Sequence, residues 1–124
     1  MQEALFLLLL LQIKHFAADF VLQWDYTLKN RRIYGHPGGL AHVAIHGLGT
    51  LVAFLVWGGA FAQLFLIVLI AEVVLHYHID WAKDNLNAKL DLGMNDQKYW
   101  WLVGFDQFLH QATYVVMVAY LAPF

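Results

Sequence analysis

The chain alternates between four long apolar segments and shorter polar connections. The apolar segments cover about residues 3–24, 38–57, 60–85 and 98–121. Each is long enough to cross a hydrocarbon core as a helix, which takes about 20 residues for about 30 Å. The pattern therefore predicts an all-α fold: an integral membrane four-helix bundle, up-down-up-down, in a single domain over residues 1–124.

The connections order these predicted helices. Gly58-Gly59 allows only a very short turn, so the second and third helices should be antiparallel neighbours. The other two connections, 25–36 and 86–97, are longer and polar, and we expect both to be loops. Three glycines inside the predicted helices are expected to permit close helix contact: Gly47, Gly49 and Gly104.

Each predicted helix carries one pair of ionisable residues spaced four apart. Four residues is slightly more than one helical turn, so both members of a pair project from the same face. Together the pairs contain five histidines and three aspartates. The pairs are His15 with Asp19, His42 with His46, His76 with Asp80, and Asp106 with His110.

The composition also indicates a membrane protein. Hydrophobic residues make up 61% and charged residues 13% of the chain, whereas a soluble domain has about 25% charged residues. The chain has no cysteine, which excludes disulfides and thiolate metal ligands. A formal charge of −2 gives no reason to expect nucleic acid as a partner, so the expected partner is membrane lipid. Met1-Gln2-Glu3 lacks the positive charge of a signal peptide, and we expect the first segment to be a retained helix.

The basic residues predict an orientation. The positive-inside rule places the loops that are rich in Lys and Arg in the cytoplasm. Both long connections are rich in them, and the termini and the Gly58-Gly59 turn are not. We therefore expect a multi-pass protein with both long loops cytoplasmic and both termini on the opposite side. The basic residues in or beside these loops are Lys29, Arg31, Arg32, Lys83, Lys89 and Lys98.

This topology brings all four pairs to one depth, in the cytoplasmic half of the bundle. An ionisable group at the centre of a membrane helix costs about 2.5 kcal/mol or more, so these groups should face inward and satisfy one another. A divalent metal is the simplest partner for a mixture of imidazole and carboxylate, with Zn²⁺ expected first and Fe or Mn²⁺ as alternatives. All eight members of the pairs are candidate ligands. They suffice for one or two ions, with any remainder orienting the ligands.

Several residues are candidates for catalysis. Whichever of Asp19, Asp80 and Asp106 is not a metal ligand could act as a general base. Glu72, one turn before His76, is a candidate base, a ligand or a protonated carboxyl in a helix contact. Lys83 is placed to hold a substrate anion or to extend toward water. Two histidines off this face are expected to be structural or solvent-facing: His36 and His78.

In their order, these motifs resemble a bacterial family of small membrane proteins, the domain of unknown function 3307. The resemblance spans nearly the whole chain and implies a protein of the bacterial inner (cytoplasmic) membrane that shares these polar positions. It implies no activity. The residues that carry it are His15, Asp19-Phe20, Gln23, His42, His46, His76-Tyr-His-Ile-Asp80-Trp-Ala-Lys83, Asp106-Gln107 and His110.

The site chemistry leads to one leading hypothesis and three alternatives. The leading hypothesis is a metal-dependent hydrolase of a lipid or lipid-linked (phospho)ester at the cytoplasmic leaflet, because a bound Zn²⁺ lowers the pKa of a water to about 7. Lys83 and the Arg31-Arg32 loop would attract an anionic headgroup. The alternatives are a di-iron membrane oxidoreductase, a metal or proton transporter, and a metal-free structural membrane protein. A transporter of this size would require a homo-oligomer.

Overall fold

The computed structural model describes residues 1–58 and 62–122. These residues are all-helical and contain no strand, so the predicted all-α class is confirmed for them. The helices are α1 (Gln2–Phe16), the π-helical turn η1 (Ala17–Val21), α2 (Asp25–Asn30), α3 (Pro37–Trp57), α4 (Ala62–Lys89) and α5 (Gln97–Leu121).

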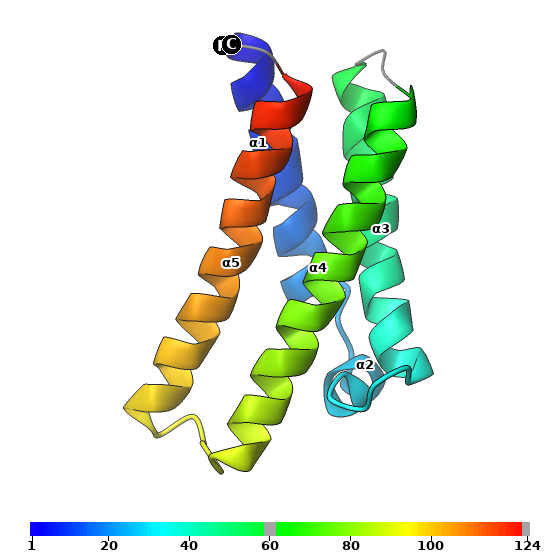
Figure 1. Cartoon of the computed structure of the whole chain (residues 1–124). Helices are drawn as coiled ribbons and strands as arrows, with labels where there is room; N and C mark the ends of the chain where they lie inside the picture. Colours follow the sequence, from blue (N-terminus) through cyan, green and yellow to red (C-terminus); the bar gives the residue numbers. More distant parts are fainter. Residues whose placement is uncertain (59–61, 123–124) are drawn as a thin grey trace.

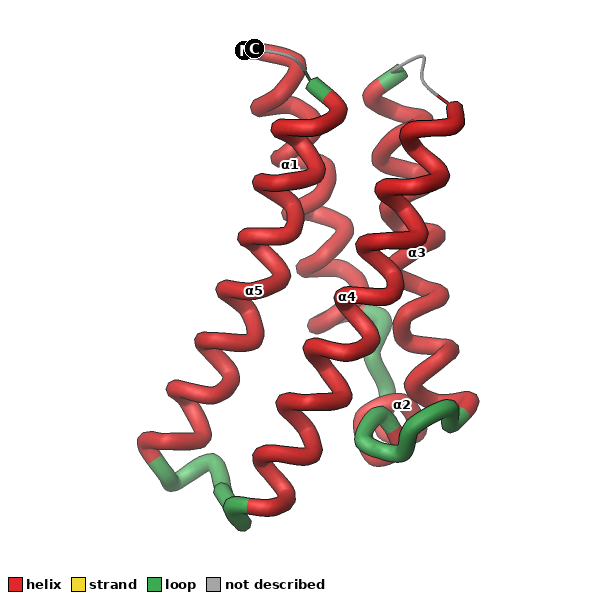
Figure 2. The backbone as a smooth tube through the Cα atoms, viewed as in Figure 1, coloured by secondary structure: helices red, strands yellow, loops and turns green. Residues whose placement is uncertain are grey.

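The four long helices lie side by side, and the short α2 lies across one end of them (Figure 1). Helix α1 contacts both α3 and α5, and α4 contacts the same two helices, so the contacts close a ring. The start of α1 and the end of α5 lie together at one end of the molecule (Figure 1). The loop between α4 and α5 lies at the other end, together with α2 and its loops (Figure 2). Both long connections are therefore at the same end, as predicted.

The predicted bounds of the second and fourth segments agree with α3 and α5 to within one residue. The prediction of a plain loop over 25–36 is wrong, because α2 forms there. Thr27 stabilises its first turn: the hydroxyl accepts from the Trp24 amide at 3.4 Å and donates to the Trp24 carbonyl at 2.7 Å. The first segment is also shorter than predicted and ends at Val21. Gly59 and the predicted helix start at residue 60 lie outside the described residues.

Three stretches are long and apolar enough to cross a membrane: Gln2–Val21, Pro37–Trp57 and Gln63–Lys89. Helix α5 is not among them, although its 25 residues are enough in length. Its polar residues, among them Lys98, Asp106 and His110, lower its hydropathy. The expectation of a membrane protein is thus supported by three helices.

The apolar core fills the half of the structure near the chain termini. Leu7 and Leu11 of α1 have no exposed surface, and Phe54 of α3 and Met117 of α5 pack with them. These residues all lie on the terminal side of the polar pairs along their helices. The polar pairs are therefore left to fill the other half, beside α2.

Two of the three predicted helix-contact glycines are confirmed. A Cβ atom on Gly47 would lie 3.0 Å from the Val73 side chain, and one on Gly49 would lie 3.4 Å from Lys14. The prediction is wrong for Gly104, where nothing lies within 4 Å. A closer approach occurs at Gly38, whose Cβ would lie 2.9 Å from the carbonyl oxygen of Tyr26. The absence of a side chain there lets α2 pack on the first turn of α3.

We predict that Gly38→Ala destabilises the protein and that Gly104→Ala does not. The new methyl group at position 38 meets backbone, so α2 must shift at a cost of about 1–3 kcal/mol. Alanine at position 104 meets nothing and favours the helix by about 0.5–1 kcal/mol. Thermal unfolding in detergent measures both variants. An equal loss of Tm in the two would contradict the close α2–α3 contact.

Candidate metal centre

The eight predicted ligands meet in one buried cluster. Each of them is at most 7% exposed. The imidazole of His76 lies at the centre, with its ring centroid 3.7 Å from that of His46 and 4.0 Å from that of His110. The His15 and His42 rings lie 6.1 Å and 5.5 Å from it. The prediction that the polar pairs face inward and form one buried cluster is confirmed.

Asp19 enters the cluster from η1. The π-helical turn is closed by the Leu22 amide, which donates to the Ala17 carbonyl at 2.8 Å. Such turns are frequent at functional sites, because the extra residue re-aims the side chains around it. Asp19 Oδ1 lies 2.9 Å from His46 Nε2 and 3.3 Å from His42 Nε2.

Asp80 is the second carboxylate of the cluster, and three imidazoles approach it. Its Oδ2 lies 3.0 Å from His42 Nε2 and 3.4 Å from His76 Nε2. Its Oδ1 lies 3.3 Å from His110 Nε2. His110 Nε2 is also 3.3 Å from Oδ1 of Asp106, the third carboxylate. Asp80 thus joins imidazoles of α3, α4 and α5.

Two sets of residues could each hold a metal ion, with ligand atoms that all lie within 4.8 Å of one another: Asp19 with His42, His46 and His76, and His76 with Asp80 and His110. In a tetrahedral Zn²⁺ site, ligand atoms about 2.0–2.2 Å from the ion are about 3.3–3.6 Å apart. Contacts as wide as the 4.8 Å limit of these sets would have to close by about 1 Å around an ion. His76 belongs to both sets, so it is the residue on which either arrangement depends.

Several buried atoms of the cluster make no well-directed hydrogen bond among the described residues, although an ionisable partner lies 3.0–3.9 Å from each. They are Nε2 of His42, both ring nitrogens of His76, and Oδ1 of Asp106. A buried polar atom without a partner costs about 1–3 kcal/mol. Imidazole nitrogens and carboxylate oxygens are also the donor atoms that divalent metals bind. A metal ion would therefore remove a cost that the protein alone leaves in place.

His15, by contrast, lies outside both sets and has a partner on each ring nitrogen. Its Nε2 is 2.9 Å from Oε1 of Gln107, and its Nδ1 is 3.0 Å from the Tyr114 hydroxyl. The amide oxygen can only accept, so Nε2 carries the proton and Nδ1 accepts from Tyr114. His15 Nε2 also lies 3.2 Å from Asp19 Oδ2. In this arrangement His15 orients Asp19, and its predicted role as a ligand stays a prediction.

A buried ion pair that sequence reasoning missed lies beside the cluster. Lys14 Nζ donates to Glu72 Oε1 at 2.8 Å, and the Thr50 hydroxyl donates to Glu72 Oε2 at 3.1 Å. Lys14 Nζ also lies 3.3 Å from His46 Nδ1, and Glu72 Oε1 lies 3.9 Å from His76 Nδ1. Lys14 and Glu72 were visible as opposite charges inside apolar segments. Their pairing depends on how α1, α3 and α4 pack.

Arg31 also turns inward, although it follows α2 in a connection predicted to be a loop. Its Nη1 lies 3.3 Å from Asp80 Oδ2, and its Nε lies 3.0 Å from Asp84 Oδ2. Burial alone would lower the pKa of Arg31, but attraction to Asp80 and Asp84 outweighs burial and raises it. Lys83, a predicted catalytic residue, donates to Asp84.

The buried charges of the described residues do not balance. The cations Lys14 and Arg31 face four buried carboxylates, which leaves a formal charge of −2 when the imidazoles are neutral. One divalent ion would neutralise this charge. The four buried carboxylates are Asp19, Glu72, Asp80 and Asp106.

The two histidines predicted to lie outside the site do so. His36 caps α3, where its Nδ1 accepts from the Gly38 amide at 3.0 Å. His78 is exposed, and its ring contacts the Tyr34 hydroxyl and the Val74 carbonyl. His78 lies only two residues from His76 and points away from the cluster, as the helical spacing predicted.

Comparison with known proteins gives one finding. The family model described as "Protein of unknown function (DUF3307)" matches residues 5–123. No curated protein and no solved structure matches the chain. The matched range contains every residue of the cluster together with Lys14, Arg31 and Glu72. The resemblance to this family is confirmed, and it brings no known chemistry to the site.

We predict that Lys14 and Glu72 are strongly coupled. Lys14→Met or Glu72→Leu alone leaves one buried charge without its partner, which costs about 3–5 kcal/mol. The double variant removes both charges and should lose less stability than either single variant. Thermal unfolding of the four proteins in detergent completes the cycle. Additive losses would show that the two side chains do not interact as an ion pair.

Proposed function

The chain belongs to the DUF3307 family, whose function is unknown, and from its site chemistry we propose that it is an integral membrane metalloenzyme. Metal binding is the first part of the proposal. The observation that carries it is His76, which is 2% exposed and makes no well-directed hydrogen bond on either ring nitrogen, although carboxylate oxygens lie 3.4 Å from its Nε2 and 3.9 Å from its Nδ1. A metal ligand is the role in which a fully buried imidazole that lacks well-directed hydrogen bonds is stabilised rather than penalised.

The proposed membrane arrangement is the four-helix bundle predicted from the sequence. Helix α5 would cross with the other three, because it contacts α1 and α4 and turns Asp106 and His110 inward. The basic loops at the α2 end would be cytoplasmic, at the inner membrane. This arrangement puts the cluster in the half of the membrane nearer the cytoplasm.

We assign one divalent ion to the cluster, because one such ion balances the buried charge. Three imidazoles and one carboxylate form the first set, and two imidazoles and one carboxylate form the second. Ligand sets of this mixed nitrogen and oxygen type suit Zn²⁺, and Fe²⁺ and Mn²⁺ are the alternatives. A second ion would need further anions, such as hydroxide, to remain neutral.

Hydrolysis of a lipid ester or phosphoester is the second part of the proposal. A bound divalent ion supplies Lewis acidity and lowers the pKa of a water to about 7. In the reaction, the water oxygen bonds to the carbonyl carbon or the phosphorus, and the bond from that atom to the alcohol oxygen breaks. The proton removed from water goes to the departing alkoxide. No electron transfer or further reactant is needed.

Asp106 is the carboxylate best placed to carry that proton. It lies outside both candidate ligand sets, and its Oδ1 makes no well-directed hydrogen bond, although His110 Nε2 lies 3.3 Å from it. The other two candidate bases on the helix faces, Asp19 and Asp80, are members of the sets. Glu72 is held by Lys14 and Thr50, which assigns it to stabilising the cluster. A carboxylate beside the candidate ligand His110 is suited to accept and return a proton.

A metal-free hydrogen-bond network is the second candidate, and one observation favours it. Asp80 lies within 3.4 Å of the Nε2 atoms of His42, His76 and His110, each of which can carry a proton. Arg31 adds a positive charge at the same carboxylate. In that case the cluster would fix the packing of the helices, as polar contacts do in other membrane bundles.

We predict that the purified protein contains about one equivalent of a divalent metal and that His76→Ala loses it. His76 is common to both ligand sets, and loss of a ligand from a site this small removes most of its affinity. Elemental analysis of protein purified in detergent without added chelator measures the metal. His78→Ala is the matched control, because it removes an imidazole from the same helix on the exposed face.

The comparison of these two variants separates the candidates. Equal metal content in His76→Ala and His78→Ala, or wild-type protein without metal, would contradict the metal centre. A metal-free wild type that is destabilised by His76→Ala would instead support the network. Iron with visible absorption would favour the oxidoreductase over the hydrolase.

We predict that Asp106→Asn abolishes most hydrolysis and retains the metal. Loss of a general base lowers the rate by about 10²–10⁴-fold. The assay is release of the alcohol from phospholipid esters and phosphoesters in mixed micelles, with elemental analysis of the same sample. Full activity in Asp106→Asn would remove Asp106 from this role. No hydrolysis of any ester or phosphoester by metal-loaded wild type would contradict the hydrolase itself.

A further inference from the structure

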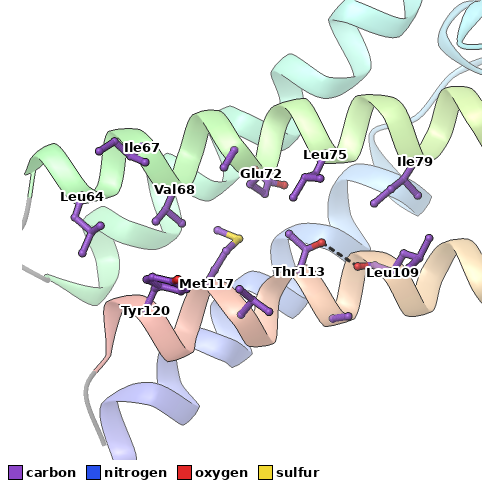
Figure 3. A pocket seen from close by; sticks show the side chains of 13 residues that line it. Leu64, Ile67, Val68, Glu72, Leu75, Ile79, Leu109, Thr113, Met117 and Tyr120 are labelled. Atoms are coloured by element: carbon purple, nitrogen blue, oxygen red, sulfur yellow. Dashed lines mark hydrogen bonds between the residues drawn. The ribbon is translucent and has the colours of Figure 1, made fainter.

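An apolar groove runs between α4 and α5 (Figure 3). Its volume is about 570 Å³, which is within the range of about 300–1,000 Å³ for small-molecule sites. The side chains of Val68, Leu75 and Met117 line it, and the small residues Ala71 and Ala112 lie along it. Because their side chains are short, these alanines leave space between the two helices.

Two of the three polar side chains in the groove, Thr113 and Glu72, are already satisfied, and the third, Tyr120, is 71% exposed. The Thr113 hydroxyl donates to the Leu109 carbonyl at 2.9 Å, as the dashed line in Figure 3 shows. Glu72 is 1% exposed and is bonded to Lys14 and Thr50. The groove lining therefore offers water few hydrogen-bonding groups and favours an apolar occupant.

We propose that this groove holds one hydrocarbon chain of an anionic membrane lipid and that this lipid is the substrate. The groove lies along Gln63–Lys89, one of the stretches able to cross a membrane. From Leu64 to Ile79 its length is about 22 Å at about 1.5 Å per residue. Half of a hydrocarbon core is about 15 Å, so the groove can take a chain from one leaflet.

Charge decides which end of the groove receives the headgroup. Lys83 lies four residues after Ile79, on the same side of α4, and is paired with Asp84. Lys89 and Lys98 lie at the end of α4 and the start of α5, at the same end of the molecule. No Lys or Arg occurs in residues 33–82 or 99–124, so the Leu64 end has none. Asp84, Asp91 and Asp96 lie at the Ile79 end as well, so this end is charged without being net positive. The exposed Lys89 and Lys98 are the cations there that an anionic headgroup would contact.

This orientation places the bond to be cleaved beside the cluster. Ile79 and Leu109 line the groove, and the next residues on their helices are Asp80 and His110. The first carbons of the chain, and the ester that joins them to the headgroup, would lie at this level. Glu72 links the two sites, because it lines the groove and lies 3.9 Å from His76. The assignment as substrate rests on the proposed hydrolase, whereas the binding of the chain does not.

Photo-crosslinking tests the groove directly. The full chain is placed in phosphatidylcholine vesicles that contain a trace of phosphatidylglycerol with a diazirine midway along one chain. After irradiation, mass spectrometry locates the label. We expect it on groove residues such as Leu75 and Met117, in preference to Leu55, which is 72% exposed on α3. Uniform labelling of all lipid-facing residues would overturn the proposal.

Two groove-filling variants and a matched control sharpen the test. Ala112→Phe and Ala71→Phe fill the groove from its two walls and should lower labelling there about tenfold. Ala119→Phe adds the same ring on the exposed face of α5, outside the groove, and should leave it unchanged. If one filling variant does not fold, the other still decides. Unchanged groove labelling in a folded filling variant would overturn the proposal.

Two further readings distinguish the remaining outcomes. A phosphatidylcholine probe of the same design should label the groove less than phosphatidylglycerol, and equal labelling would overturn the anionic headgroup. Protein–protein crosslinks across the groove in place of lipid would show that a second copy of the chain covers it. Metal content is measured on the same samples. Groove labelling in protein without metal would contradict the proposed metalloenzyme but not the lipid site. Bound metal without groove labelling would contradict the lipid site but not the proposed metalloenzyme.

Discussion

The arrangement of the helices depends on the free-energy cost of burying ionisable groups away from water. Four carboxylates, five imidazoles, Lys14 and Arg31 are buried among helices whose outer faces are apolar. Such groups are stable in a low-dielectric interior only when they satisfy one another or bind an ion. This requirement selects the helix faces that turn inward and brings the polar pairs to one level. It also explains why Arg31, the residue after the short helix α2, lies against Asp80.

Much of this was predictable from spacing alone. Pairs four residues apart, such as His76 and Asp80, had to share a helix face, and alternating helices had to bring them to one depth. The polar contacts that surround the pairs were harder to predict from the sequence. The π-helical turn at Ala17–Val21 and the Lys14–Glu72 ion pair depend on how separate helices pack, which no local pattern encodes. The same holds for the turn of Arg31 toward the cluster, because Arg31 in isolation is a typical loop cation.

Helix α4 connects the two halves of the proposed function. One side presents His76 and Asp80 to the cluster, and the adjoining side presents Leu75 and Ile79 to the groove. Consecutive residues of a helix point in directions about a quarter turn apart but differ by only about 1.5 Å along the helix axis. The cluster and the groove therefore lie at the same depth. A lipid chain in the groove would therefore reach the centre from within the membrane. Under the proposal, the substrate would approach a buried polar site through an apolar groove.

The proposed function requires that the imidazoles bind a metal ion. X-ray absorption at the edge of the metal that co-purifies with the wild-type protein examines this bond itself. We predict a signal with nitrogen and oxygen neighbours at about 2.0–2.2 Å and the outer scattering of histidine rings. A protein without a metal edge, or a metal surrounded by water oxygens alone, would contradict it.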